Sequence, residues 1–216
     1  GPGRMAEPEA VVAAAYGVVG AARRDLAGLR VVVSAGGTQE PIDPVRFIGN
    51  RSSGKQGVAV ALAAAERGAD VVLVAAHIDA GVRDAAARRA GIRIVDAGTA
   101  AELGDAVRAA AADADVVVMA AAVADYRVTG VSDSKLTKES AAGAGRTLEL
   151  VETEDILAGL TRDRVTGQTM VGFAAETPQD ADDLLERGRR KRERKGVDLL
   201  VVNEVGWSAG FERDEN

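Results

Sequence analysis

The sequence contains no cysteine and only one histidine, His77, in 216 residues. The absence of cysteine excludes disulfides, thiolate metal ligands and thiol catalysis. A single histidine excludes a histidine metal cluster. The sequence has no signal peptide and no apolar run of 18 residues, so we expect a cytoplasmic protein with no membrane partner.

Excess positive charge and aromatic residues are also lacking. The formal net charge is −6 and aromatic residues make up 3% of the chain, so we expect no nucleic-acid partner. The basic run at residues 187–195 is therefore interpreted as the solvated face of a helix.

The residues that are present favour a packed α/β protein. Hydrophobic residues make up 47% of the chain, which is long enough for one sizeable domain. We expect residues 1–28 to be a tag remnant followed by an interdomain linker or helix. Residues 29–216 are then expected to form the domain.

Short apolar runs alternate with helical patterns along most of the chain. Such continuous apolar runs are typical of parallel strands that are buried on both faces. The pattern predicts a doubly wound, Rossmann-like parallel sheet with ligands at the carboxyl ends of its strands. The expected strands are 30–34, 70–75, 92–95, 115–120, 169–174 and 198–202, and the expected helices are 55–67, 82–90, 100–112, 155–162 and 180–194.

One region, residues 124–154, breaks this alternation. It is rich in Gly, Ser, Thr and Lys, and polar and apolar residues alternate at 147–152, as in a half-exposed antiparallel strand. We expect a projecting antiparallel arm, called the flap below, through which the chain forms a homodimer. A disordered surface excursion is the alternative.

The stretch Gly49–Lys55, GNRSSGK, nearly matches a phosphate-binding loop. Gln56 stands where such a loop has the Ser or Thr that contacts magnesium, and the preceding strand ends about fifteen residues earlier. A helix starting near Lys55 would still present free backbone amides to a phosphate. We therefore expect an anion at Ser52, Ser53 and Gly54, but no conventional nucleotide-triphosphatase loop.

A nicotinamide oxidoreductase is the first alternative function. The segment 34–38 follows a strand, as a dinucleotide-binding turn would, but it lacks the Gly-x-Gly-x-x-Gly pattern. The second strand also ends without the acidic residue that would bind a ribose. A noncatalytic nucleotide-binding regulatory domain is the second alternative.

Five ordered segments resemble the signature of the phosphopantothenoylcysteine synthetase family. They are residues 37–46, 50–55, 120–126, 135–138 and 172–177. The resemblance runs from about Leu29 to the end of the chain. Relatives continue beyond Asn216 into a final strand or hairpin, and in bacteria this unit is fused to a flavin-dependent decarboxylase.

The resemblance implies that the protein joins 4′-phosphopantothenate to L-cysteine with CTP and Mg²⁺. The substrate carboxylate attacks the α-phosphate to give an acyl-cytidylate and pyrophosphate. The cysteine amine then attacks the intermediate and releases CMP. The resemblance does not identify direct metal ligands, and the choice of CTP over ATP depends on it alone.

The resemblance also assigns residues to this chemistry. Lys135 would stabilise the cytidylation transition state, and Asn50 would orient the acyl group for turnover. Asp125 would contact the nucleotide directly or through a cation, and Lys191 and Lys195 share a helix face because they are four residues apart. The full nucleotide-binding set is Met119, Ala120, Ala121, Asp125, Lys135, Phe173, Ala174, Ala175, Glu176, Lys191 and Lys195. The substrate- and phosphate-binding set is Gly37, Asn50, Arg51, Ser52, Ser53 and Gly54.

Overall fold

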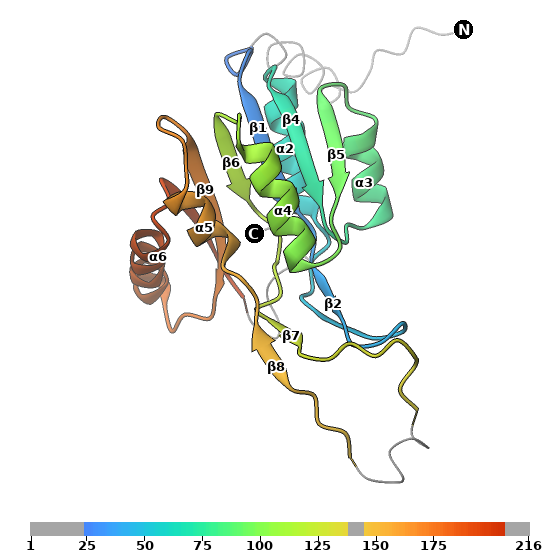
Figure 1. Ribbon diagram of the computed structural model, residues 1–216. Helices are drawn as coiled ribbons and strands as arrows, with labels where there is room; N and C mark the ends of the chain where they lie inside the picture. The colour runs from blue at the N-terminus through green and yellow to red at the C-terminus, as the bar shows by residue number, and fades with distance from the viewer. Residues whose placement is uncertain (1–23, 138–144, 206–216) are drawn as a thin grey trace, which may run out of the picture.

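The computed structural model describes residues 24–137 and 145–205, and its centre is a six-stranded parallel sheet (Figure 1). The strands are ordered β10-β9-β6-β1-β4-β5. The chain builds outward from β1 to β5, returns to β6 beside β1, and then builds outward to β10. The strand order therefore reverses between β1 and β6, as predicted for a doubly wound fold. The bounds are β1 Arg30–Ala35, β4 Asp70–Ala75, β5 Ile92–Asp96, β6 Val116–Met119, β9 Thr169–Glu176 and β10 Leu199–Glu204.

Helices cover both faces of the sheet. On one face lie α2 (Lys55–Glu66) and α3 (Ala80–Ala87); α4 (Ala100–Ala111) and α5 (Ile156–Arg162) lie on the other (Figure 1). The last helix, α6 (Ala181–Lys195), packs on β9 and β10. Two apolar clusters separate these layers. Val32, Leu103, Val107, Leu160 and Met170 belong to one, and Val33, Val58, Ala61, Leu73 and Ala86 belong to the other.

Local sequence signals explain where the helices begin. The hydroxyl of Thr99 accepts a hydrogen bond from the Glu102 N–H, and the Glu102 carboxylate accepts one from the Thr99 N–H, at 3.2 and 3.0 Å. This reciprocal capping satisfies two free amides at the start of α4. The predicted strands and helices are confirmed, although α3 begins at Ala80 rather than residue 82 and ends at Ala87 rather than residue 90.

The insert between β1 and α2 forms a hairpin that the strand–helix alternation did not predict. Strands β2 (Gln39–Pro41) and β3 (Phe47–Gly49) pair in antiparallel fashion. The buried Asp43 carboxylate closes the turn by accepting the N–H groups of Val45 and Arg46, each at 2.8 Å. The hairpin therefore explains why the GNRSSGK stretch lies so far from its strand.

The flap contains a second antiparallel pair, β7 (Tyr126–Val128) and β8 (Leu150–Glu152). It projects away from the parallel sheet, beyond the carboxyl ends of the strands (Figure 1). The antiparallel arm is confirmed, and its second strand covers only the last three residues of the alternating patch. Most of the expected leader at 1–28 lies outside the described residues, as do residues 206–216. Within the described ranges, no helix has the length and apolar character needed to cross a bilayer.

Replacing Gly57 with alanine should destabilise the protein, although alanine normally favours helices. A Cβ at this position in α2 would lie 2.6 Å from the Ala35 Cβ and 2.8 Å from the Ser34 carbonyl oxygen. Overpacking against a buried strand costs about 1–3 kcal/mol. The free energy of unfolding, measured in denaturant, should fall by that amount.

The matched control is Gly81→Ala in α3, where nothing lies within 4 Å of the added Cβ. This substitution should raise the unfolding free energy by about 0.5–1 kcal/mol. Equal effects of the two substitutions would contradict the close packing of α2 on β1.

Candidate functional site

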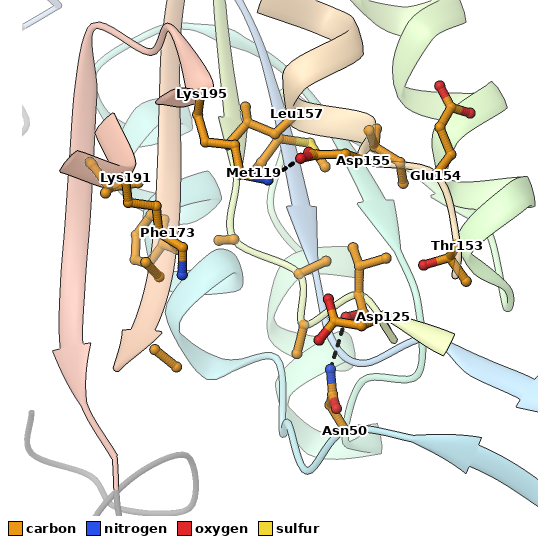
Figure 2. Close-up of a pocket in the computed structure, with 18 of the residues that line it drawn as sticks. Asn50, Met119, Asp125, Thr153, Glu154, Asp155, Leu157, Phe173, Lys191 and Lys195 are labelled. Atoms are coloured by element: carbon orange, nitrogen blue, oxygen red, sulfur yellow. Dashed lines mark hydrogen bonds and ion pairs between the residues drawn. The ribbon is translucent and has the colours of Figure 1, made fainter. Parts of the chain in front are cut away.

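A pocket with a volume of about 860 Å³ lies at the carboxyl ends of β6, β9 and β10, between α5 and α6 (Figure 2). Its position is the ligand-binding edge predicted for a doubly wound sheet. Ten of the residues that the sequence assigned to binding line this one pocket. They are Asn50, Met119, Ala120, Ala121, Asp125, Phe173, Ala174, Ala175, Lys191 and Lys195.

The floor of the pocket is the segment that follows β6, and two buried hydroxyls fix its backbone. The Ala121 N–H donates to the Ser34 hydroxyl at 3.1 Å, and the Ala124 N–H donates to the Thr38 hydroxyl at 2.9 Å. Both hydroxyl residues are fully buried. Small side chains at 120–122 leave the main chain accessible, so a planar ligand can approach backbone groups that are already fixed.

Asn50 reaches the same floor from the end of the β2–β3 hairpin. Its side-chain amide donates to the Val123 carbonyl oxygen at 2.9 Å, which fixes the orientation of the amide group (Figure 2). Gly37 supports this arrangement, because a Cβ there would lie 2.8 Å from the Asn50 backbone oxygen. Gly37 is thus a close packing partner of Asn50 and does not itself line the pocket.

Two lysines on one face of α6, together with Arg194, form the cationic wall of the pocket. Lys191 pairs with Glu176 at 2.5 Å. Lys195 pairs with Asp155, as Figure 2 shows. Burial alone would raise the pKa of the Asp155 carboxyl, but hydrogen bonds from Lys195 and from the Ala158 N–H outweigh it and lower that pKa below its ordinary value. Asp155 is therefore ionised at neutral pH, and both lysines are charge-compensated.

The sequence reasoning missed the start of α5 as part of the site. Residues 154–157 line the pocket, and the Asp155 side chain accepts the Ala158 N–H at 3.1 Å as a helix cap. An Asp before an apolar helical run signals a helix start, but it does not indicate which way that start faces. Gln56 and Asn203 also line the pocket and share a hydrogen bond of 3.1 Å between their amides.

Several predicted residues lie outside the pocket lining. Gly54 is buried beneath Ile78, whose side chain would lie 2.9 Å from an added Cβ. Glu176 is the partner of Lys191. Lys135 is exposed on the flap. The predicted residues absent from the lining are Gly37, Arg51, Ser52, Ser53, Gly54, Lys135 and Glu176.

The pocket lining also carries carboxylates, at Asp125, Glu152, Glu154 and Asp155. Within residues 24–137 and 145–205, no three His, Asp or Glu side chains converge as a metal site. Mg²⁺ commonly binds through one or two carboxylates together with substrate phosphates, so it does not need a complete protein cage. An exposed pocket carboxylate such as Asp125 fits that requirement.

Comparison with known proteins identifies relatives over the whole chain. The family model for the DNA/pantothenate metabolism flavoprotein C-terminal domain matches residues 26–216. The chain is 49% identical over 224 residues to the coenzyme A biosynthesis bifunctional protein CoaBC of Mycolicibacterium smegmatis, covering 100% of this chain and 52% of that protein. The corresponding Escherichia coli K12 protein is 39% identical over 217 residues, with 100% and 51% coverage.

A solved structure of the C-terminal domain of CoaBC superposes with a TM-score of 0.65 at 33% identity. The match covers 83% of this chain and 79% of that structure. This chain spans about half the length of the curated relatives that it matches.

Proposed function

We propose a function on the basis of family membership: this chain belongs to the DNA/pantothenate metabolism flavoprotein C-terminal domain family. On that basis, the chain would be a phosphopantothenoylcysteine synthetase. It would join 4′-phosphopantothenate to L-cysteine at the expense of CTP. The observation that carries the proposal is the gathering of Asn50, the segment after β6 and the two α6 lysines around one pocket. In the full-length protein this unit would act in the cytoplasm beside a flavin-dependent decarboxylase.

The proposed reaction activates a carboxylate, which is a poor acyl donor because it is negatively charged and has a poor leaving group. One carboxylate oxygen forms a bond to the α-phosphorus of CTP while the bond to the β-phosphate bridge breaks and pyrophosphate leaves. The cysteine amine then forms a C–N bond to the acyl carbon, loses a proton and displaces CMP. The first step needs positioning and stabilisation of developing charge more than it needs covalent catalysis.

The pocket geometry supports a specific placement of the nucleotide. The pyrimidine would lie against the backbone of 119–121, and the triphosphate would extend toward Lys191 and Lys195. Each lysine would then exchange a carboxylate partner for phosphate oxygens. Such charge-assisted hydrogen bonds are roughly twice as strong as neutral ones.

Mg²⁺ would neutralise charge on the triphosphate and on the departing pyrophosphate. Asp125 would hold it from the protein side, together with the nucleotide's own phosphates. Orientation of the acyl group and binding of the outer phosphates are then left to side chains of the protein. The fixed amide of Asn50 orients the acyl group, and the α6 lysines bind the departing end of the nucleotide.

A homodimer formed through the flap would complete this site. Exposed apolar side chains occur on the β2–β3 hairpin and on the flap, which are in contact with each other. Clustered apolar surface of this kind marks protein interfaces. Because Lys135 lies outside the pocket lining of its own chain, we assign it to the pocket of the twin chain. The exposed apolar residues are Val45, Phe47, Tyr126, Val131, Leu148 and Leu150.

Pyrophosphate release tests the proposed function directly. We expect release only when CTP, 4′-phosphopantothenate and Mg²⁺ are all present, with CMP and the amide appearing after cysteine is added. Replacing CTP with ATP in the same assay tests whether the protein prefers the cytosine base, and we expect slower pyrophosphate release with ATP. Reduction of a nicotinamide cofactor would favour the oxidoreductase alternative, and CTP binding without turnover would favour a regulatory domain.

Replacing Asn50 with aspartate should slow the second step selectively. The substitution places a carboxylate oxygen against the Val123 carbonyl and removes the donated hydrogen bond. Without this bond the side chain no longer holds the acyl group in place, and because a misplacement of about 1 Å can cost about 100-fold in rate, attack by cysteine should slow about 10–100-fold. Acid quenching should trap the acyl-cytidylate in the variant. Wild-type levels of intermediate would contradict this role for Asn50.

A further inference from the structure

The buried carboxylate of Asp43 lies outside the pocket lining, yet it contacts the flap. Its side chain has no solvent exposure. One oxygen, Oδ1, accepts the Val45 and Arg46 N–H groups of its own turn at 2.8 Å. The other, Oδ2, accepts the Arg46 Nε–H at 3.0 Å and the Leu136 N–H, 93 residues away, at 3.1 Å. Oδ1 therefore binds the backbone of the turn, whereas Oδ2 binds the Arg46 side chain and the flap.

Leu136 is held at both of its backbone polar groups. While its N–H donates to Asp43, its carbonyl oxygen accepts a hydrogen bond from the Arg46 guanidinium at 2.6 Å. Four residues earlier, the Ser132 N–H donates to the Ile42 carbonyl oxygen at 2.9 Å. Lys135 lies between these two attachment points. The hairpin thus fixes the flap backbone on both sides of the exposed lysine.

We propose that Asp43 is a positioning residue for Lys135, holding its backbone through Leu136 so that the lysine is presented at a fixed place. This inference rests on the proposed function, in which Lys135 stabilises the transferring phosphate. A catalytic cation on a projecting arm is effective only when its backbone is fixed, because a misplacement of about 1 Å can cost about 100-fold in rate. The Asp43–Arg46 pair supplies that fixation.

The electrostatics of the pair support a permanent contact. The Arg46 side chain lowers the pKa of the Asp43 carboxyl well below its usual range, against the opposing effect of burial. The folded-state pKa lies below the unfolded-state pKa, so this stabilisation is present at neutral pH. It is lost only as the pH falls below the ordinary range of an aspartate. The hold on Leu136 therefore persists under assay conditions.

Replacing Asp43 with asparagine separates the two functions of the carboxylate. The amide oxygen can still accept the two turn N–H groups, but the amide nitrogen then faces two donors, Leu136 N–H and the Arg46 guanidinium. The turn survives while the attachment to the flap is broken. We expect kcat for pyrophosphate release to fall about 10–100-fold, with KM for CTP unchanged within about threefold. Hydrogen exchange at the Leu136 amide should accelerate.

A double-mutant cycle with Lys135→Gln decides whether Asp43 acts through Lys135. If it does, Asp43→Asn causes no further loss in the Lys135→Gln background. Additive losses, or an unchanged kcat in Asp43→Asn, would overturn the proposal. Arg46→Lys, which keeps the charge but not the planar fork, is a second variant should Asp43→Asn fail to fold, and its loss of kcat should likewise vanish in the Lys135→Gln background. Asp84→Asn, at an exposed site on α3, is the matched control.

The same experiment distinguishes this inference from the proposed function. A wild-type protein that releases no pyrophosphate contradicts the proposed function, and the inference falls with it. An active wild type with additive variants contradicts the inference alone.

Discussion

Replacing Lys135 with glutamine should reduce the rate of pyrophosphate release about 10²–10³-fold, the usual loss when one preorganised donor is removed from a developing charge. Glutamine keeps most of the length of the side chain but lacks its positive charge. Because the lysine would act mainly in the transition state, kcat should fall while KM for CTP changes little. Single-turnover measurements with CTP, 4′-phosphopantothenate and Mg²⁺ give the rate of the first step.

Arg127→Gln is the matched control for Lys135→Gln. Arg127 is another exposed cation of the flap, on β7, and it does not line the pocket. Its replacement should leave the rate within about threefold of wild type, as expected for a surface charge without a role. Near-normal release by Lys135→Gln, or an equal loss in both variants, would contradict the assignment.

If the chain forms the proposed homodimer, mixed dimers should reveal which of the two pockets Lys135 acts on. We combine Lys135→Gln chains with Asn50→Asp chains and measure formation of the amide product, which each variant alone should make slowly. If Lys135 acts on the twin chain's pocket, each mixed dimer contains one site with both residues intact. Equal mixing should then restore the rate of amide formation to about one quarter of the wild-type rate, because about half of the dimers are mixed and one of their two sites is complete. No recovery would place Lys135 in its own chain's site.

Neutralising both α6 lysines should weaken CTP binding about 10²–10⁴-fold, since each hydrogen bond to a charged group contributes about 1.5–3 kcal/mol. In Lys191→Gln/Lys195→Gln the partner carboxylates, Glu176 and Asp155, also remain without their cations. They would then repel the triphosphate. Calorimetric titration with CTP and Mg²⁺ measures the loss.

Two controls isolate the phosphate contribution. CMP lacks the β- and γ-phosphates, so its affinity should change by less than about threefold in the double variant. Adding Asp155→Asn to Lys195→Gln should recover part of the CTP affinity, because the repelling charge is removed and asparagine still caps α5. An equal loss for CMP and CTP would show that the lysines support the fold of the pocket and do not contact the outer phosphates.

The parallel sheet and the edge that carries the pocket could be predicted from sequence. Strands such as 70–75 are continuous apolar runs, and a doubly wound order places ligands at their carboxyl ends. The burial of Gly54 depends on a tertiary contact that no local pattern encodes, since Ile78 comes from the loop after β4 and covers it. The same is true of Glu176, whose carboxylate meets Lys191 across 15 residues of chain.

Lys135 illustrates a different limit of sequence reasoning. Its motif indicates chemistry, but its place in space is set by Asp43 and Arg46, which lie about ninety residues earlier and have no periodic relation to it. Likewise, Asp155 is recognisable as a helix cap, whereas its facing a lysine of α6 depends on how two helices pack.

The loop after β1 has a mechanical consequence. Gly37 bridges His77 on one side and Ala122 on the other, so the backbone spans the point where the strand order reverses. A Cβ at the preceding Gly36 would lie 2.6 Å from the His77 carbonyl oxygen, so the two backbone segments are closely packed here. The loop therefore adds backbone contacts between the two halves of the sheet, beyond the pairing of β1 with β4 and β6. With the centre of the sheet held in this way, we expect any tightening around a bound nucleotide to occur at α5, α6 and the flap, which surround the pocket.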